Sequence, residues 1–163
     1  MKKLLLISLT LFGTFTFDYS FAANTKSKVY LTKDIPSFEK YCYEQINKVR
    51  QQHGMGPLKM WPQLSDCARE HSLNMAMGKC PCGHEGFDER AKEMRNFAHL
   101  SSFGENVAYS FGYKDPVMVA VKGWMESKGH RENILADFEE TGIGVSITKD
   151  GKFYITQLFS KCR

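Results

Sequence analysis

Three short segments of this chain carry side chains that can bind a divalent metal ion or exchange a proton. The first surrounds His84, the second surrounds Glu105 and the third surrounds His130. Neutral imidazole and carboxylate oxygen are both good ligands for zinc, and a set of three protein ligands leaves one coordination position open. We therefore expect His84, Glu105 and His130 to converge on a site for zinc or a similar divalent cation.

Glu105 also has a purely structural interpretation. It precedes a strand-like run, and its carboxylate can instead anchor Arg131 or a backbone amide as a buried ion pair. His130 follows the helix that contains Trp124, and we expect it at the C-terminal turn of that helix. The helix dipole favours a positive imidazole there, whereas a neutral imidazole can accept a metal ion. The sequence leaves both interpretations of Glu105 open.

The other three histidines are not assigned to the site. His71 lies on the apolar stripe of an expected helix, where a histidine is typically a core residue satisfied by a hydrogen bond. His53 and His99 lie in expected loops without a matching partner, and we assign them to the surface.

The cysteines allow two kinds of chemistry. An extended backbone would place Cys80, Cys82 and His84 on one face as a compact soft-metal site. In an oxidising compartment, the simpler prediction is a loop joined by disulfides to other elements. With five cysteines, at most two bridges can form, and the sequence does not choose their connectivity. The five are Cys42, Cys67, Cys80, Cys82 and Cys162.

The first residues predict an export signal. Lys2 and Lys3 precede an apolar run, and small residues follow, so we place the signal peptide at 1–22 with cleavage after Ala22. The run is shorter than the ~20 residues that a membrane span needs, and no later segment replaces it. We expect a polar lead-in at 23–36, a single domain at 37–163, and a secreted or periplasmic location.

The charge pattern argues against nucleic acid as a partner. The formal net charge is only +4, and the basic residues are scattered among acidic ones. No dense block of Lys and Arg is present to follow a phosphate backbone.

Hydrophobic periodicity and capping residues predict four helices. We expect them at 37–52, from Pro62 to Gly78, at 88–95 as a short and highly charged helix with a solvated face, and from Pro116 onward after an Asp115 N-cap.

Strand signals are concentrated near the end of the chain. Residues 143–147 alternate between apolar and smaller or polar residues, Asp150-Gly151 supplies a hairpin turn, and 153–159 forms the return strand. A further strand is expected at 106–110. Helices that cover a small, largely antiparallel sheet make an α+β domain.

Six motifs in their order along the chain resemble the CAP superfamily of cysteine-rich secretory, antigen 5 and pathogenesis-related 1 proteins, and in particular its bacterial secreted branch. Each motif alone is weak, but their joint order is specific, and the similarity extends from about Phe38 to Phe159. The motifs are Ile46-Asn47-Lys48-Val49-Arg50, the run from Ala68 to Ala76, Gly83-His84, the run from Gly104 to Ala108, the run from Trp124 to Leu135, and the run from Gly142 to Val145.

The resemblance implies a three-layer α-β-α sandwich and a cleft with two histidines and two acidic residues that can hold zinc. His84, His130 and Glu105 match three of these positions, whereas Ser127 occupies the position of the second acidic residue. Glu126 is one residue away, about 200° around the helix from Trp124. If Trp124 is buried, Glu126 faces solvent, and we therefore expect weaker metal binding than in the full pattern.

Two classes of function follow. The first is a binding module that holds a metal ion and engages an extracellular or envelope ligand, such as a lipid, a peptide or a host protein. The alternative is a metal-dependent hydrolase, a peptidase or esterase, that uses the same cleft. The sequence has no His-Glu-x-x-His helix and no Gly-x-Ser-x-Gly elbow. We therefore favour a binding module, as a monomer or weak dimer, over an enzyme.

Overall fold

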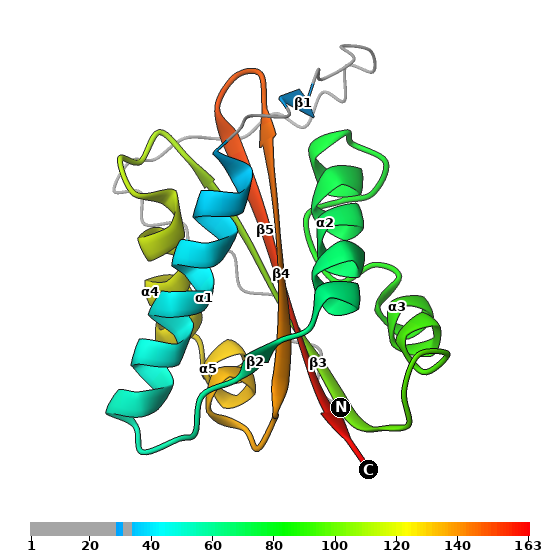
Figure 1. The fold of residues 1–163 in the computed structure, drawn as a ribbon. Helices are drawn as coiled ribbons and strands as arrows, with labels where there is room; N and C mark the ends of the chain where they lie inside the picture. The colour runs from blue at the N-terminus through cyan, green and yellow to red at the C-terminus, as the bar shows by residue number, and fades with distance from the viewer. Residues whose placement is uncertain (1–28, 31–33) are drawn as a thin grey trace.

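The domain is a central sheet covered on both faces by helices (Figure 1). The computed structural model describes residues 29–30 and 34–163, so the predicted signal peptide and most of the predicted lead-in lie outside the described residues. The predicted α+β class and three-layer sandwich are confirmed. None of the described helices combines the length and the apolar character needed to cross a bilayer.

Three long strands form the body of the sheet. They are β3 (Leu100–Phe111), β4 (Glu140–Thr148) and β5 (Lys152–Cys162), and two-residue strands β1 (Val29–Tyr30) and β2 (Lys59–Met60) pair with β4. The order β1-β4-β5-β3 leaves β3 at an edge, antiparallel to β5. The predicted hairpin is confirmed, with Gly151 at φ 84° in its turn. The edge strand is longer than the predicted 106–110.

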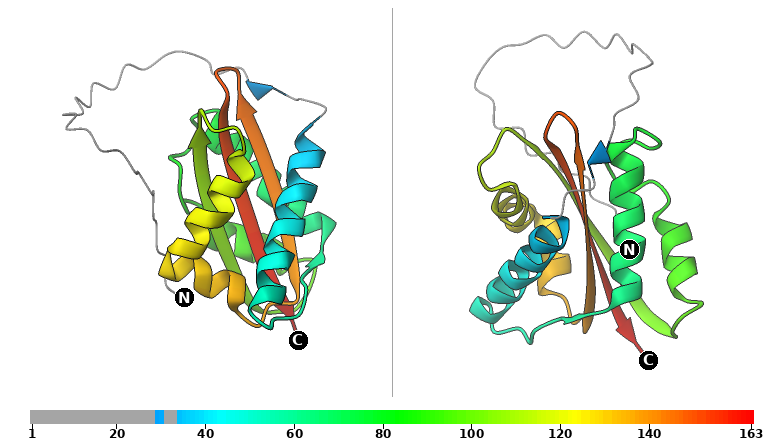
Figure 2. Two further views of the ribbon diagram at one scale, coloured as in Figure 1. Left: turned by 90° about the vertical axis from the view of Figure 1, so that its left-hand side faces the viewer. Right: turned by 45° about the horizontal axis from the view of Figure 1, so that its top comes forward.

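The helices form two layers, which Figure 2 shows from two further directions. On one side lie α1 (Ile35–Gln52), α4 (Pro116–Glu126) and α5 (Lys128–Leu135), and on the other lie α2 (Pro62–Ala76) and α3 (Phe87–Met94). Each layer has its own hydrophobic core against the sheet. All four predicted helices are therefore present, whereas α5 was not predicted.

Two glycines of β4 allow α2 to lie directly on the sheet. A Cβ atom added at Gly142 would lie 2.2 Å from the backbone carbon of Leu64, and one at Gly144 would lie 2.2 Å from that of Ala68. The residues between and beyond them, such as Ile143, face the other core. In this strand the glycines therefore face α2 at close range, whereas the apolar residues that alternate with them pack into the core on the other face of the sheet.

Ser127 separates α4 from α5. Its extended backbone, at φ −90° and ψ 124°, ends one helix and begins the next without an intervening loop. His130 is consequently the third residue of α5. Our prediction that it lies in a C-terminal helical turn was wrong, because α4 ends at Glu126 and a second helix starts directly after the extended residue Ser127.

The cysteines are all free thiols. Cys42 and Cys67 are buried, whereas the remaining three are partly exposed. The predicted disulfides are therefore not confirmed. Burial raises the pKa of the Cys42 thiol to about 12, so this side chain is a neutral core residue.

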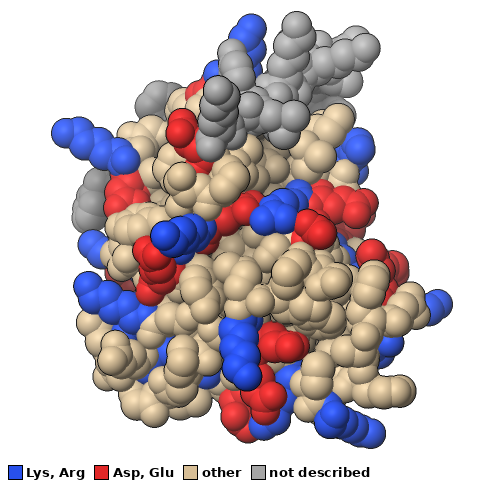
Figure 3. Space-filling view, in the orientation of Figure 1, with Lys and Arg blue, Asp and Glu red and all other residues tan. Residues whose placement is uncertain are grey.

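Charged side chains on the face seen in Figure 3 are interspersed in sign. No large single-sign field dominates this face, as the scattered charge pattern of the sequence predicted.

Candidate functional site

The structure brings His84 and His130 together from opposite sides of the edge strand. His84 lies between α2 and α3, and His130 lies in the first turn of α5. Their ring centroids are 6.2 Å apart, and the rings are tilted by 42°. His130 is 3% exposed. Residues 46 positions apart in the chain thus form one pair of imidazoles, with His130 buried and the His84 side chain 11% exposed.

Three ring nitrogens of this pair have no hydrogen-bond partner among the described residues. They are Nε2 of His84 and both Nδ1 and Nε2 of His130. Buried polar atoms in proteins are normally paired, because an unpaired one costs about 1 to 3 kcal/mol. A neutral imidazole nitrogen of this kind can bind a metal ion or a ligand proton.

The fourth ring nitrogen, Nδ1 of His84, is fixed by Glu105. It lies 2.8 Å from Oε1 of Glu105, and an ionised carboxylate only accepts hydrogen bonds, so Nδ1 carries the proton. The lone pair of a neutral His84 is then on Nε2. A carboxylate behind a histidine commonly fixes the tautomer and orientation of a metal-binding imidazole in this way.

Glu105 is itself held by Arg90 of α3. Arg90 donates from Nε to Oε2 and from Nη2 to Oε1, each at 2.8 Å, which makes a bidentate ion pair. The Glu105 side chain is only 1% exposed. The ion-pair interpretation of Glu105 is thus present in the structure, with Arg90 as the partner in place of Arg131.

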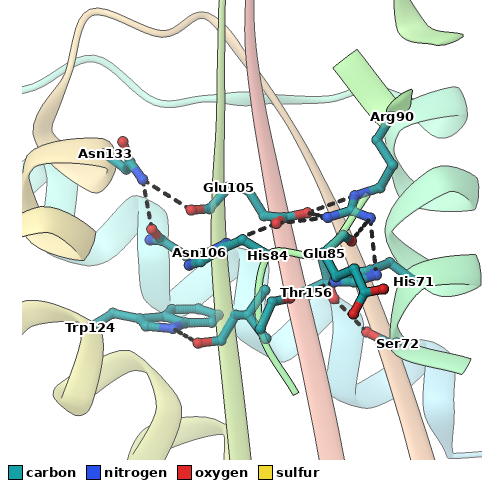
Figure 4. Close-up of polar contacts among 12 residues, drawn as sticks. His71, Ser72, His84, Glu85, Arg90, Glu105, Asn106, Trp124, Asn133 and Thr156 are labelled. Atoms are coloured by element: carbon teal, nitrogen blue, oxygen red, sulfur yellow. Dashed lines mark hydrogen bonds and ion pairs between the residues drawn. The ribbon is translucent and has the colours of Figure 1, made fainter. Parts of the chain in front are cut away.

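The same guanidinium also contacts α2 and the preceding loop. Its Nη1 lies 2.8 Å from the carbonyl oxygen of Glu85 and 3.1 Å from Nδ1 of His71. His71 Nε2 lies 2.8 Å from the carbonyl oxygen of Gly83. Because the guanidinium is donor-only, His71 accepts at Nδ1 and donates at Nε2. Figure 4 shows this chain of contacts from α2 to the edge strand.

His71 is therefore a buried, hydrogen-bonded histidine, as we predicted, and it also supports the site. Its contact with Gly83 holds the loop that carries His84. Burial lowers the pKa of His71, and the charge of Arg90 lowers it further, so the imidazole is kept neutral.

Three successive residues of β3 hold the segment that carries His130. Nδ2 of Asn106 donates to the carbonyl oxygen of His130. Nε1 of Trp124 donates to the carbonyl oxygen of Val107, and Nδ2 of Asn133 donates to that of Glu105 (Figure 4). Asn133 thus ties α5 to the sheet.

Arg131, which we considered as a partner of Glu105, instead donates from Nη1 to the carbonyl oxygen of Met125 in α4.

The electrostatics of the site favour a neutral His130. Burial lowers its pKa to about 4, and the proximity of His84 adds to the effect. Its position in the first turn of a helix acts in the same direction, because the helix N-terminus repels a positive charge. At neutral pH His130 therefore has a free lone pair.

The donor set fits a metal ion that prefers nitrogen ligands. Two imidazoles bound to one zinc ion at about 2.0–2.1 Å hold their ring centroids roughly 5 to 6 Å apart. The observed 6.2 Å is close to this range. The described residues contain no group of three His, Cys, Asp or Glu side chains arranged to hold a metal ion. A metal ion between the two histidines would therefore have two protein ligands, both of them imidazole nitrogens.

The neighbouring polar residues follow the helix geometry that we predicted. Trp124 is 2% exposed, Glu126 is exposed to solvent and Ser127 is 6% exposed. The Oγ atom of Ser127 is buried and has no hydrogen-bond partner among the described residues. His53 and His99 are exposed, as expected.

The sequence reasoning missed Arg90. We predicted α3 as a solvated face, but the Arg90 side chain is only 11% exposed. Its spacing contained a signal, since Arg90 lies three residues after Phe87, next to Ala91 and four before Met94, and these three are buried. A basic residue inside a buried stripe indicates a buried acidic partner.

Comparison with known proteins identifies relatives over most of the chain. The sequence model of the cysteine-rich secretory protein family, CAP, matches residues 43–159. The uncharacterised protein YkwD of Bacillus subtilis is 35% identical over 143 residues, which are 86% of this chain and 54% of YkwD. The chain thus spans about half the length of this relative, and the matched part of the uncharacterised B. subtilis membrane protein YlbC is 34% of its length.

Solved structures agree on the fold. An outer surface protein of Borrelia burgdorferi has a TM-score of 0.67 at 18% identity, with 84% of this chain and 99% of that one covered. An extracellular SCP-domain protein of Bacillus anthracis has a TM-score of 0.63 at 25% identity, with coverages of 81% and 44%. A cysteine-rich secretory protein of Staphylococcus aureus has a TM-score of 0.61 at 23% identity, with coverages of 79% and 40%.

Proposed function

The chain belongs to the cysteine-rich secretory protein (CAP) family, and on this basis we propose that it is an exported binding module that holds a divalent metal ion between His84 and His130. Glu105, which we predicted as a third ligand, acts in this proposal through the hydrogen bond that it accepts from Nδ1 of His84. Zinc is one of the ions that suit neutral imidazole ligands, and it is the ion that we propose.

The observation that carries this proposal is the set of three buried ring nitrogens without a partner among the described residues. One unpaired nitrogen would cost stability, and three in neighbouring rings would cost several times as much. A metal ion satisfies one nitrogen of each ring at once. The free lone pair of His84 and the neutral state of His130 both support this role.

An ion held by two protein nitrogens keeps other coordination positions open. Bound there, it supplies a Lewis acid that can accept a carboxylate or carbonyl oxygen from a partner molecule. We propose that the partner is an extracellular or envelope ligand, such as a peptide, a lipid or a host protein. A secreted or periplasmic location follows from the export signal predicted at 1–22, and the structural relatives include an outer surface protein and an extracellular protein.

Zinc titration by calorimetry tests the proposal. We expect the purified protein to bind one zinc ion, and the double variant His84→Ala, His130→Ala to lose at least about 100-fold in affinity, because both ligands are gone. The matched control is His53→Ala, His99→Ala, which removes two exposed histidines. Equal affinity in the wild type and the site variant would refute the proposed metal site.

A further inference from the structure

Arg90 holds both oxygens of Glu105, the carboxylate that is hydrogen-bonded to His84 beside His130. We propose that Arg90 is a positioning residue that sets the ion specificity of the site, because it keeps Glu105 as the hydrogen-bond acceptor of His84 and out of the coordination sphere. This inference rests on the proposed function for the identity of the site. Its effect on the His84 tautomer can be measured without any metal ion.

The geometry leaves the guanidinium little freedom. Two of its nitrogens bond Glu105, and Nη1 is held by the carbonyl oxygen of Glu85 and by Nδ1 of His71. The guanidinium is planar and rigid, so contacts on three sides fix its plane and with it the plane of the carboxylate. Glu105 thus cannot rotate toward the two histidines unless the bidentate pair breaks.

This arrangement decides which nitrogen of His84 is free. Oε1 of Glu105 accepts from both Arg90 and His84, so Nδ1 of His84 must carry the proton and Nε2 the lone pair. The variant Glu105→Gln would orient His84 differently, because an amide has a donor group as well as an acceptor. The donor-only guanidinium would hold the amide oxygen, and the amide NH₂ group would turn toward His84, which could then only accept at Nδ1.

The same arrangement favours one class of metal ion. Imidazole nitrogen suits zinc, copper and nickel, whereas carboxylate oxygen suits manganese, magnesium and calcium. With Glu105 bound to Arg90, the described residues provide two imidazoles at the site and no group of three metal ligands. If Arg90 releases Glu105, the site gains an oxygen ligand, and its preference for zinc over manganese should become smaller.

The first experiment measures the tautomer of His84 by ¹⁵N NMR in metal-free protein, in mildly alkaline buffer. We expect the Nδ1–H form in the wild type and the Nε2–H form in Glu105→Gln. In Arg90→Met, Glu105→Gln, the amide is no longer oriented, and we expect a mixture of both forms. An unchanged tautomer in Glu105→Gln, or the same tautomer in the single and double variants, would overturn the positioning role.

The second experiment compares zinc and manganese binding. In Arg90→Met we expect the ratio of zinc to manganese affinity to fall about tenfold or more, the size typical of changes behind a metal ligand. Adding Glu105→Gln should restore the ratio, because the freed oxygen ligand is removed. A ratio that stays at the wild-type value in Arg90→Met would contradict the inference, as would a reduced ratio that persists in the double variant.

A rescue experiment covers the case in which Arg90→Met folds poorly. Arg90 lines a cavity of about 310 Å³ between α2 and α3, whose rim includes Glu85, Glu89 and Glu93. A small guanidinium compound can enter such an acidic cavity. In Arg90→Ala, we expect low concentrations of methylguanidinium to restore the ratio of zinc to manganese affinity, whereas methylammonium at the same concentration should not. Equal recovery with both compounds would argue against the bidentate contact as the cause.

These readouts separate the two proposals. If the wild type binds no zinc but the tautomer changes as described, the metal site fails and the positioning role of Arg90 stands. If zinc binds at His84 and His130 but the tautomer and the ion ratio do not respond to Arg90, only the present inference fails.

Discussion

Two buried clusters of polar side chains, one around Arg50 and one around His84 and His130, differ in whether the protein itself satisfies them. Arg50 is 2% exposed and donates to the carbonyl oxygens of Gly56, Ile134, Ala136 and Phe138. These contacts join α1 to the loop that follows it and to the segment from Ile134 to Phe138. They use most of the hydrogen-bond donors of the guanidinium group. The two histidines are also largely buried, yet three of their nitrogens have no partner among the described residues. A satisfied cluster supports the fold, whereas an unsatisfied one indicates a ligand.

Removing Arg50, the centre of the satisfied cluster, should cause the largest loss of stability. In Arg50→Met, four carbonyl groups lose a charged donor, two of them in buried hydrogen bonds, and we expect the free energy of unfolding to fall by about 3 to 5 kcal/mol. Urea denaturation followed by circular dichroism measures this change. Lys48→Met, at an exposed position of the same helix, is the control and should stay within about 0.5 kcal/mol of the wild type. Similar losses in both variants would remove the distinction between the two clusters.

The unsatisfied cluster should make the metal-free protein sensitive to acid. The pKa of His130 is about 4 in the folded protein and about 6.5 in the unfolded chain, so the unfolded state binds more protons between these values. Stability is therefore lost as the pH falls through this window, by up to roughly 3 kcal/mol.

His130→Leu lacks this titration, and its denaturation midpoint in chelator should depend less on pH between 6.5 and 4. The carboxylates and His71 titrate in both proteins, so only the difference between the two curves is informative. Parallel curves for the two proteins would mean that His130 is not buried as a neutral group.

Zinc should stabilise the native protein through the same cluster. At a free zinc concentration about 100 times the dissociation constant, binding raises the free energy of unfolding by about 2.7 kcal/mol. Differential scanning calorimetry with and without zinc measures the shift. His84→Ala, His130→Ala should show no shift, whereas His53→Ala, His99→Ala should match the wild type. Stabilisation of the site variant by zinc would place the ion elsewhere.

The smallest loss of stability is expected for a change at Asn133, which joins α5 to β3. Asn133→Ala removes the donor to the carbonyl oxygen of Glu105 and to Oδ1 of Asn106, which should cost about 1 to 2 kcal/mol. The neighbouring Glu132 is exposed and forms a surface pair with Lys128 at 3.9 Å. Glu132→Ala should change stability by less than about 0.5 kcal/mol. If the two variants cost the same, the anchoring role of Asn133 is not supported.

The sequence predicted the elements whose periodicity and end signals agree. The Pro62 and Pro116 helices begin at those residues, and the hairpin turn at Asp150-Gly151 is as predicted. The helix α5 was missed because it begins two residues after the end of α4. No glycine or proline marks that break, which depends only on the extended backbone of Ser127.

The site was predictable in its histidines but not in its supporting contacts. His84 and His130 come together because the fold places both beside β3, and the family motifs carry that information. The partner of Glu105 depends on how α3 packs, and a charged octapeptide does not reveal which of its side chains turns inward. Sequence reasoning therefore predicted that the two imidazoles lie near each other, as they do at 6.2 Å, but chose Arg131 over Arg90 as the candidate ion-pair partner.

The three contacts between β3 and the segment from Trp124 to Asn133 also constrain the length of the chain. They join successive strand residues, Val107, Asn106 and Glu105, to positions that follow one another along α4 and α5. An insertion or deletion between Trp124 and Asn133 would move some of these residues away from their partners in β3, so the three hydrogen bonds could no longer all form. We expect natural length variation in this family to avoid this segment and to occur at the hairpin tip near Asp150 and in the connection near Gly112, where the chain is not held to a fixed count in this way.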